Sequence, residues 1–273
     1  MIRDITIGQY YPAKSPIHKL DPRTKLAGTL IFIISVFLFH TVVGYAVATV
    51  FLAGMILIST VPVKFIFKGL KAIFMILLIT MVFNILLTPG EAIVTLGIFK
   101  ITKEGISMAV RMAIRLIYLV IGSSLMTLTT TPNQLTDGLE KSLRPLNKIH
   151  VPVHEIAMMM SIALRFIPIL LEETDKIMKA QIARGADFEN GNLIQKVKNM
   201  VPLLVPLFIS AFRRANDLAM AMEARCYRGG EGRTKMKPLK YHKEDRMAYI
   251  TVIAYVILVV VIGRCVPVHI WVF

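Results

Sequence analysis

The sequence predicts an all-α, polytopic helical membrane protein with about five spans and a long helical module on one side of the membrane. Hydrophobic residues make up 55% of the 273 residues and charged residues 18%, whereas soluble domains average about 45–50% and about 25%. The mean hydropathy is +0.64. Long charge-free runs alternate with basic stretches, which is the pattern of a chain that crosses a bilayer several times.

The charge-free runs predict where the spans lie. A hydrocarbon core of about 30 Å needs about 20 apolar helical residues, so the run 26–61 is too long for one span. His40 to Gly44 is where we expect it to reverse. The first span is then short, which suits a tilted or partly re-entrant helix. The predicted spans are residues 26–41, 44–61, 71–88, 106–130 and 247–263.

The distribution of basic residues predicts the orientation in the cell membrane. Of the 32 Lys and Arg residues, 27 fall in residues 1–25, 62–71 and 131–246, which are alternate connections on one side. Basic connections stay inside, so the N-terminus is expected in the cytoplasm. The first 25 residues lack the apolar region of a cleavable signal peptide. The net charge is +15, but the basic residues are not interleaved with stacking aromatic residues on a soluble domain. We therefore expect no nucleic-acid partner.

Four segments follow from these patterns. Residues 1–25 are a cytoplasmic basic lead-in, 26–130 hold transmembrane helices, 131–246 form a cytoplasmic module, and 247–273 hold the terminal transmembrane helix and tail. The third segment is too long for a structureless connection. It opens with Thr131-Pro132, which predicts an N-cap followed by proline in the first helical turn.

Two long helices are expected in the cytoplasmic module, at residues 154–182 and about 193–226. Each begins apolar and ends polar. Pro168 is expected to kink the first, and Pro202 and Pro206 interrupt the second.

Both long helices end in a similar tripeptide. The first ends in Ala183-Arg184-Gly185 and the second in Ala224-Arg225-Cys226. Taken singly, each is typical of a helix C-terminus, where glycine supplies a left-handed cap and arginine suits the helix dipole. Two copies on similar helices favour a shared function, and we predict that both tripeptides are docking tips.

Other groups of residues leave two interpretations open. The methionines at 158–160, 220 and 222 are typical either of an adaptable binding surface or of ordinary helical packing. Arg111 and Arg115 lie within a predicted span, where charged side chains are often functional, although snorkelling to the headgroups also explains them.

Catalytic and cofactor signatures are missing from the sequence. There is no phosphate-binding G-x-x-x-x-G-K-[ST] loop. His150 and His154 are separated by Pro152, which argues against a metal pair. Cys226 and Cys265 fall on opposite sides of the predicted membrane, so no disulfide is expected. The acidic residues at 172, 173 and 175 lie beside lysines at 176 and 179, as on a solvated helix face.

The lead-in and the paired tripeptides together resemble a known family. "GQYYPAKSPIHKLDPRTKL", from Gly8 to Leu26, is similar to the N-terminal signature of the transmembrane T component of energy-coupling factor (ECF) transporters. The tripeptides at 183–185 and 224–226 resemble that family's two Ala-Arg-Gly-type motifs. The resemblance covers essentially the whole chain, although Cys226 departs from the common glycine or serine.

The resemblance implies a non-catalytic transport subunit in a bacterial or archaeal cell membrane. Its partners would be two ABC-type ATPase subunits, which bind ATP and Mg²⁺, and a small substrate-binding S component that delivers a vitamin or metal ion. The long coupling helices would cross, and Arg184 and Arg225 would dock on ATPase carboxylates.

Two alternatives make different demands on the sequence. An autonomous secondary carrier or channel predicts inverted repeats and ionisable residues near the bilayer midplane. A membrane enzyme predicts a catalytic cluster at the membrane surface. The sequence shows neither pattern.

Overall fold

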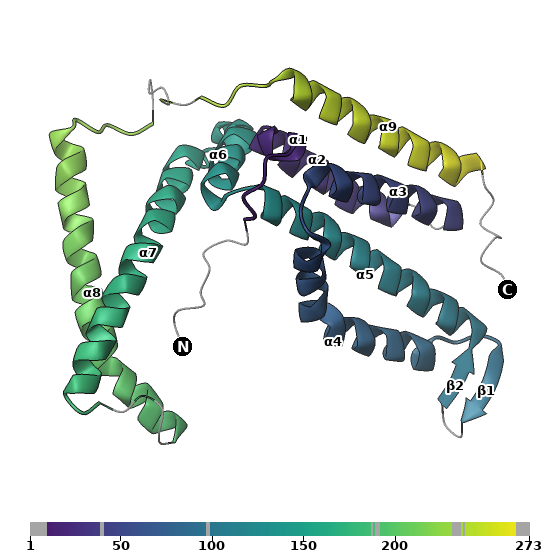
Figure 1. Ribbon diagram of the computed structural model, residues 1–273, viewed down its shortest axis with the longest axis horizontal. Coiled ribbons are helices and arrows are strands. Elements are labelled where there is room, and N and C mark those ends of the chain that lie inside the picture. The colour runs from purple at the N-terminus through teal and green to yellow at the C-terminus, as the bar shows by residue number, and fades with distance from the viewer. Residues whose placement is uncertain are drawn as a thin grey trace. The chain divides into compact units, whose positions relative to one another are not determined.

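The computed structural model describes residues 10–38, 41–96, 99–186, 188, 192–230, 236 and 238–265 (Figure 1). The chain divides into two compact units. The bundle unit comprises Gly8–Gly138 and Leu239–Phe273, and the long-helix unit comprises Met1–Ile7 and Leu139–Pro238. The bundle unit is therefore built from both ends of the chain, whereas most of the long-helix unit comes from one continuous segment.

The bundle unit consists of helices and one short hairpin. Among the described residues, six helices lie wholly in it, and a seventh, α6, starts in this unit and ends in the other. The elements are α1 (Pro16–Lys19), α2 (Pro22–Leu38), α3 (Val42–Ser59), α4 (Val63–Leu87), β1 (Ala92–Leu96), β2 (Phe99–Thr102), α5 (Lys103–Thr129), α6 (Pro132–Leu143) and α9 (Lys243–Cys265).

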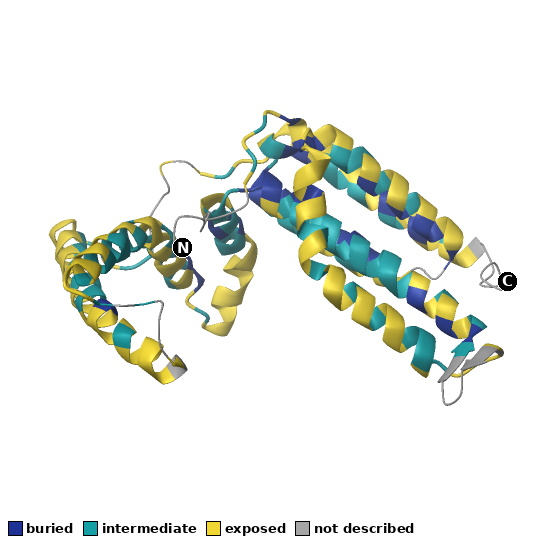
Figure 2. Ribbon diagram, turned by 60° about the horizontal axis from the view of Figure 1, so that its bottom comes forward, coloured by how far each residue is buried: buried dark blue, intermediate teal, exposed yellow. Residues whose placement is uncertain are grey.

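An aromatic core holds α2, α3, α5 and α9 together. Figure 2 shows buried positions along these helices. The rings of Phe51 and Tyr255 stack with centroids 4.2 Å apart. A Cβ on Gly122 would lie 2.8 Å from a ring atom of Phe32, so glycine lets α5 approach α2 closely. The buried core residues are Phe32, Val36, Tyr45, Ala48, Leu52, Tyr118, Tyr255 and Val259.

The predicted spans correspond to helices, but one boundary was wrong. The span predicted at 71–88 is the helix α4, which already begins at Val63. The basic stretch before residue 71 was predicted as a connection, because its lysines interrupt the apolar run. Lys64, Lys68 and Lys71 instead recur at helical spacing, and lysine is a good helix former.

Within the described part of the chain, five helices are long and apolar enough to cross a membrane, although they are not the predicted five. Four of them, α3, α4, α5 and α9, belong to the bundle unit, and the fifth, α7, belongs to the long-helix unit. The helix α2, predicted as the first span, has 17 residues, which is about 25 Å and shorter than the hydrocarbon core. The helix α7 lies in the segment predicted as cytoplasmic, and the side of the membrane on which it lies stays a prediction. The all-α, polytopic membrane class is confirmed.

An antiparallel hairpin of β1 and β2 connects α4 to α5 and was not predicted. Its register pairs Ala92 with Thr102 and Leu96 with Phe99. The Thr102 side chain then accepts a hydrogen bond from the Gly105 N–H at 3.1 Å and caps α5. The hairpin therefore turns the chain between two membrane-length helices.

The helix α6 begins as its sequence predicts. The Thr131 hydroxyl accepts a hydrogen bond from the Gln134 N–H at 3.3 Å, and the Gln134 side chain accepts one from the Thr131 N–H at 3.1 Å. This reciprocal pair is a capping box. Thr131 and Pro132 therefore take the two positions predicted for them.

The long-helix unit consists of the end of α6, the 3-10 helix η1 (Arg144–Ile149), α7 (Val153–Ala183) and α8 (Leu193–Ala224). Both long helices match their predicted ranges to within two residues. Pro168 lies inside α7, and Pro202 and Pro206 lie inside α8. Prolines at these places leave both helices continuous.

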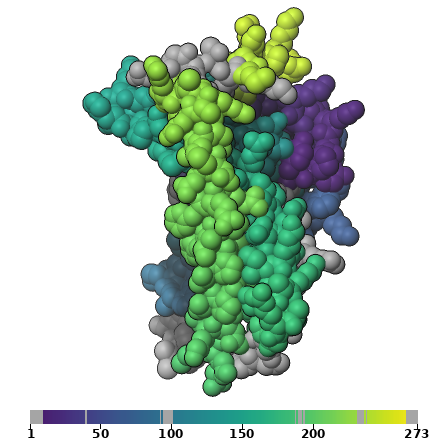
Figure 3. Space-filling view, turned by 90° about the vertical axis from the view of Figure 1, so that its left-hand side faces the viewer, coloured from purple at the N-terminus to yellow at the C-terminus, as the bar shows by residue number. Residues whose placement is uncertain are grey.

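The helices α7 and α8 pack against each other in an antiparallel sense. The Gln181 side chain donates to the Pro202 carbonyl at 3.3 Å, and Arg214 pairs with Glu173 at 3.1 Å. Figure 3 shows the two helices side by side, and Figure 1 shows them crossing. Among the described residues of this unit only Val153, Ala157 and Leu203 are buried. Most of both helices therefore faces outward in the isolated chain.

Candidate functional site

The tip of α7 is a regular left-handed cap. Arg184 is the C-cap residue and Gly185 follows with φ +88°. The Gly185 N–H donates to the Ile182 carbonyl at 2.9 Å, and the Ala186 N–H donates to the Gln181 carbonyl at 3.0 Å. This pair of bonds is the Schellman motif. It satisfies two carbonyls that a helix end leaves open.

The tip of α8 has the same motif without a glycine. Arg225 is the C-cap residue and Cys226 follows with φ 54°. The Cys226 N–H donates to the Glu223 carbonyl at 2.8 Å, and the Tyr227 N–H donates to the Met222 carbonyl at 3.0 Å. A non-glycine residue in this region costs about 1 kcal/mol or more. The α8 tip therefore keeps its geometry at an energetic cost.

The six predicted docking residues are all exposed. They are Ala183, Arg184, Gly185, Ala224, Arg225 and Cys226. Capping requires the left-handed residue and not the arginine before it, so the cap explains Gly185 but not Arg184. The helix caps do not require the guanidinium groups of the two exposed arginines. These groups are therefore available to a partner.

The structure separates the two tips and does not bring them together. The end of α7 lies beside Pro202 on α8, because Gln181 contacts that residue. From Pro202 to Arg225 the helix α8 rises about 35 Å. A single small ligand could not touch both arginines. Two binding surfaces, one for each tip, fit this separation.

The segment after the α8 tip rests on the start of α7. A Cβ on Gly230 would lie 2.2 Å from the His154 ring, so a side chain there would force that ring to move. The His154 ring in turn pairs with Glu140 of α6 at 3.0 Å. His154 therefore helps to hold the chain that leaves Arg225, and it faces Glu140 instead of acting with His150.

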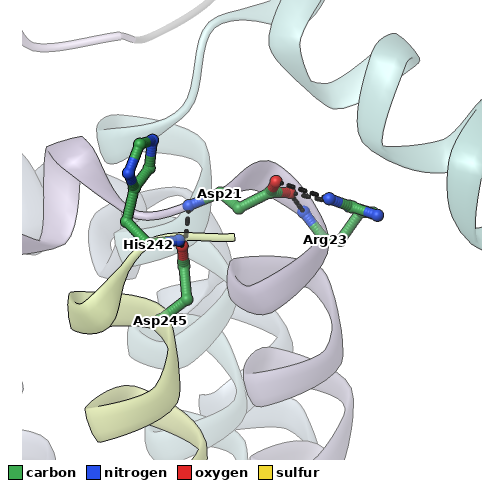
Figure 4. Close-up of polar contacts among 4 residues, drawn as sticks. All are labelled: Asp21, Arg23, His242 and Asp245. Carbon is green, nitrogen blue, oxygen red and sulfur yellow. Dashed lines mark hydrogen bonds and ion pairs between the residues drawn. The ribbon is translucent and has the colours of Figure 1, made fainter. Parts of the chain in front are cut away.

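The lead-in motif forms a buried polar network in the bundle unit (Figure 4). The Asp245 carboxylate accepts hydrogen bonds from the Asp21 and His242 N–H groups, both at 2.8 Å. The Asp21 carboxylate accepts from the Arg23 backbone and guanidinium at 2.8–3.0 Å. The Arg23 guanidinium lies 4.0 Å from the Tyr241 ring centroid. The network therefore joins the start of α2 to the start of α9.

Hydrogen bonds, charge and burial shift two pKa values in this part of the bundle unit. Burial favours a raised pKa for Asp21, but hydrogen bonds and the positive charge of Arg23 outweigh it and hold the pKa below its usual value. Burial lowers the pKa of Lys25 to about 8. The Lys25 ammonium donates to the carbonyls of Thr129 at 2.8 Å and His18 at 3.2 Å. The lead-in thus binds the end of α5 as well.

Sequence reasoning missed Asp245 and His242 in this network. Asp245 is only 1% exposed, yet it lies in the charged stretch Lys243–Arg246, which looks like a solvated helix start. Its partner Asp21 is more than 200 residues away, so no local pattern signals the contact. Gly8 of the lead-in motif and the side chain of Cys265 lie outside the described residues.

The other predicted features occupy places that suit packing or solvent. Met159, Met160 and Met220 are exposed, so they are not core residues of the isolated chain. Glu173 pairs with Arg214 and not with its neighbouring lysines. Within the described ranges no three His, Cys, Asp or Glu side chains gather as a metal site would require. Cys226 is a free, exposed cysteine.

Comparison with known proteins gives consistent matches over most of the chain. The family model described as "Cobalt transport protein" (CbiQ) matches residues 13–236. The energy-coupling factor transporter transmembrane protein EcfT of Clostridium kluyveri is 60% identical over 253 residues, 91% of this chain and 93% of that protein. The protein of that name from Acidaminococcus fermentans is 50% identical over 267 residues, covering 98% and 100%. The one from Bacillus subtilis is 49% identical over 254 residues, covering 93% and 96%.

Proposed function

The chain belongs to the family of energy-coupling factor transporter transmembrane proteins, and we propose that it is the coupling subunit of such a transporter. In this proposal it transmits the ATP-driven motion of two ABC-type ATPase subunits to a membrane-embedded S component. The S component binds a vitamin or another micronutrient for uptake. The subunit sits in the cell membrane with its N-terminus in the cytoplasm, and the ATPases bind the ATP and Mg²⁺.

One observation supports this proposal most strongly. Two helix ends of the same geometry present exposed arginines on an antiparallel helix pair, about 35 Å apart along α8. Two like tips suit two like partners. A single enzyme site or a carrier site at the bilayer midplane gives no reason for this duplication.

The chemistry of each tip suits a protein interface. A guanidinium binds a carboxylate with two parallel hydrogen bonds, which lysine cannot reproduce. Ala183 and Ala224 carry only a methyl group, so a partner surface can approach each helix end closely. Arg184 and Arg225 would each pair with an acidic group in a groove of one ATPase. The neighbouring Gly185 and Cys226 fix the direction in which the helix ends.

Transmission follows from the continuity of the helices. Each tip is the end of a helix of more than 30 residues, α7 with 31 and α8 with 32. Motion of an ATPase at a tip is therefore passed along a stiff element to the rest of the unit. The exposed apolar residues of α8, which include Val201, Phe208 and Phe212, provide the surface on which the S component would rest.

The test is a detergent pull-down of tagged chain from its native host, with mass spectrometry of the captured proteins. The wild-type chain should bring down two nucleotide-binding subunits and one or more small membrane proteins. The Arg184→Ala, Arg225→Ala double variant should lose at least about tenfold of the ATPases, which corresponds to about 1.4 kcal/mol. Each single variant should lose less, and the Arg→Lys pair should not restore full binding.

The matched control is the Lys176→Ala, Arg213→Ala double variant. Both residues are exposed on the same helices, so the change in charge is equal while the tips stay intact. This control should retain the ATPases. Full uptake by the tip double variant in proteoliposomes would refute the docking role. A chain that is captured alone and still transports would establish a secondary carrier instead.

A further inference from the structure

A short segment of the long-helix unit leads from the tip of α8 back to the start of α7. It comprises the five residues from Cys226 to Gly230, which directly follow the C-cap residue Arg225. We call this segment the tip strap. Five residues reach at most about 18 Å, so the α8 tip cannot move farther than this from Gly230. The tip strap therefore limits the movement of the tip if Gly230 is held in place.

Two glycines shape the tip strap. Gly229 has φ +88°, in the left-handed region that favours glycine, and a Cβ there would meet nothing within 4 Å. Gly230 instead lies against another residue, because a Cβ on it would be 2.2 Å from Cδ2 and 2.6 Å from Cγ of His154. Neither glycine forms the cap of α8, which is made at Cys226. The glycine pair therefore turns the backbone and brings it onto the His154 ring.

The His154 ring joins three parts of the long-helix unit. His154 lies in the first turn of α7, and its Nδ1 donates a hydrogen bond to the Glu140 carboxylate of α6 at 3.0 Å. The opposite edge of the ring, at Cδ2, faces Gly230. The side chains of His154 and Glu140 are 33% and 18% exposed, so solvent screens their contact only in part. The ring therefore links the tip strap, α7 and α6 at one point.

The partner of the ring lies on a helix that both units share. The helix α6 runs unbroken from Pro132 to Leu143, and the chain passes from the bundle unit to the long-helix unit after Gly138. Within the bundle unit, a Cβ on Gly138 would lie 2.9 Å from the Cβ of Pro22, so α6 packs closely against the start of α2. Glu140 is two residues farther along α6. A force applied at Glu140 is therefore transmitted along one continuous helix to a packed contact.

We propose that His154 is a positioning residue for the Arg225 docking tip, and that the tip strap carries the movement of this tip to α6. In the proposed function, on which this inference rests, an ATPase moves the tip. A strap held only at Arg225 would let the tip move while α6 stayed in place. The contacts of His154 with Gly230 and Glu140 remove that freedom. His154 thus acts through the tip strap and does not itself dock.

The first experiment measures the mobility of the tip strap in the purified full chain. Cys226 is a free, exposed cysteine within the strap, so a nitroxide label on it reports this mobility by electron paramagnetic resonance. Cys265→Ser removes the second of the two cysteines. In this background, His154→Ala should raise the ratio of mobile to immobile label about two- to tenfold, as expected for the loss of one hydrogen bond. Glu140→Ala should give a similar rise, and the double variant should add little, because both changes remove the same contact.

Two controls separate the tip strap from a general loosening of the unit. Glu172→Ala removes an exposed carboxylate from α7 and should leave the label on Cys226 unchanged. In a chain with Cys226→Ser and Ala183→Cys, the label reports the α7 tip and should not respond to His154→Ala. If His154→Ala does not fold, Gly230→Ala keeps both side chains but displaces the ring, and it should also free the label. An unchanged label on Cys226, or an equal change at residue 183, would overturn the proposal.

The second experiment tests the link between the tip strap and docking. The labelled chain is combined with its captured ATPases, and a second label at Ser142→Cys, exposed on α6, gives the distance to Cys226. This distance should stay the same in the wild type when ATP and Mg²⁺ are added, and should change in His154→Ala. The variant should still capture the ATPases, because both arginine tips are intact. A wild type that captures no ATPase would refute the proposed function alone, whereas equal distance changes in wild type and variant would overturn the role of His154.

Discussion

The bundle unit and the long-helix unit use their polar residues in opposite ways. In the bundle unit, Asp21, Lys25 and Asp245 are buried and bonded to groups distant in the sequence. In the long-helix unit, Glu173 and Arg214 form an ion pair that is partly exposed. The bundle unit therefore pairs these buried polar groups within itself, whereas the long-helix unit leaves most of its surface for other molecules. The stability of the first should therefore depend on single residues, and that of the second should not.

The largest expected effect is at Asp245. Asp245→Ala leaves the buried N–H group of Asp21 and the partly buried N–H group of His242 without their acceptor, and should lower the free energy of unfolding by about 3 kcal/mol. Asp245→Asn keeps one acceptor and should cost less. Glu244→Ala is the control, because that neighbour is exposed. Chemical unfolding in detergent measures all three. Similar values for Asp245→Ala and Glu244→Ala would show that the network does not stabilise the bundle unit.

The second effect depends on pH, through Asp21. Its pKa in the folded chain is below the unfolded value, so its stabilisation is present above about pH 4 and is lost as the pH falls through the folded pKa. At neutral pH, Asp21→Asn should lower the free energy of unfolding by about 2 kcal/mol. The difference from wild type should shrink on acidification. A difference that stays constant with pH would contradict the ion pair with Arg23.

The third effect compares the two helix tips. Cys226→Gly should stabilise the end of α8 by about 1 kcal/mol, because glycine adopts the left-handed conformation without strain. Gly185→Ala should destabilise the end of α7 by a similar amount. Hydrogen exchange of the Tyr227 and Ala186 N–H groups reports each cap directly. Unchanged exchange at both positions would show that the conformation of the residue after the arginine does not control the tips.

The smallest effect is at the Glu173–Arg214 pair. Its side chains are 27% and 38% exposed, so a double-mutant cycle to alanine should give a coupling of about 1 kcal/mol or less. High salt should weaken it further. A coupling as large as the loss at Asp245 would remove the contrast between the two units.

The sequence predicted the elements that depend on local patterns. Charge-free runs predicted four of the five membrane-length helices of the described residues, Thr131-Pro132 predicted the start of α6, and Arg184-Gly185 predicted a left-handed cap. The same geometry at Cys226 was not evident, because cysteine carries no preference for a positive φ. The early start of α4 was missed, since lysines near a membrane surface are compatible with either a helix or a connection.

Features that depend on distant contacts could not be predicted from the sequence. The lead-in motif suggested a family, but no pattern showed that Asp21 meets Asp245 or that Lys25 meets Thr129. The position of Arg115 beside Phe37 likewise depends on how α2 and α5 pack. The hairpin β1–β2 was missed, because two strands of five and four residues are short beside the apolar runs around them.

The pairing of Glu173 with Arg214 gives α7 and α8 an approximate local symmetry. Glu173 precedes Arg184 by eleven residues, and Arg214 precedes Arg225 by eleven residues. A two-fold axis through this pair would therefore exchange the two antiparallel helices and superimpose one arginine tip on the other. A single chain has no symmetry of its own, yet here two similar helix ends lie at equal sequence distances from the Glu173–Arg214 pair. Two identical or closely related subunits could then bind this one chain with equivalent geometry, one at each tip.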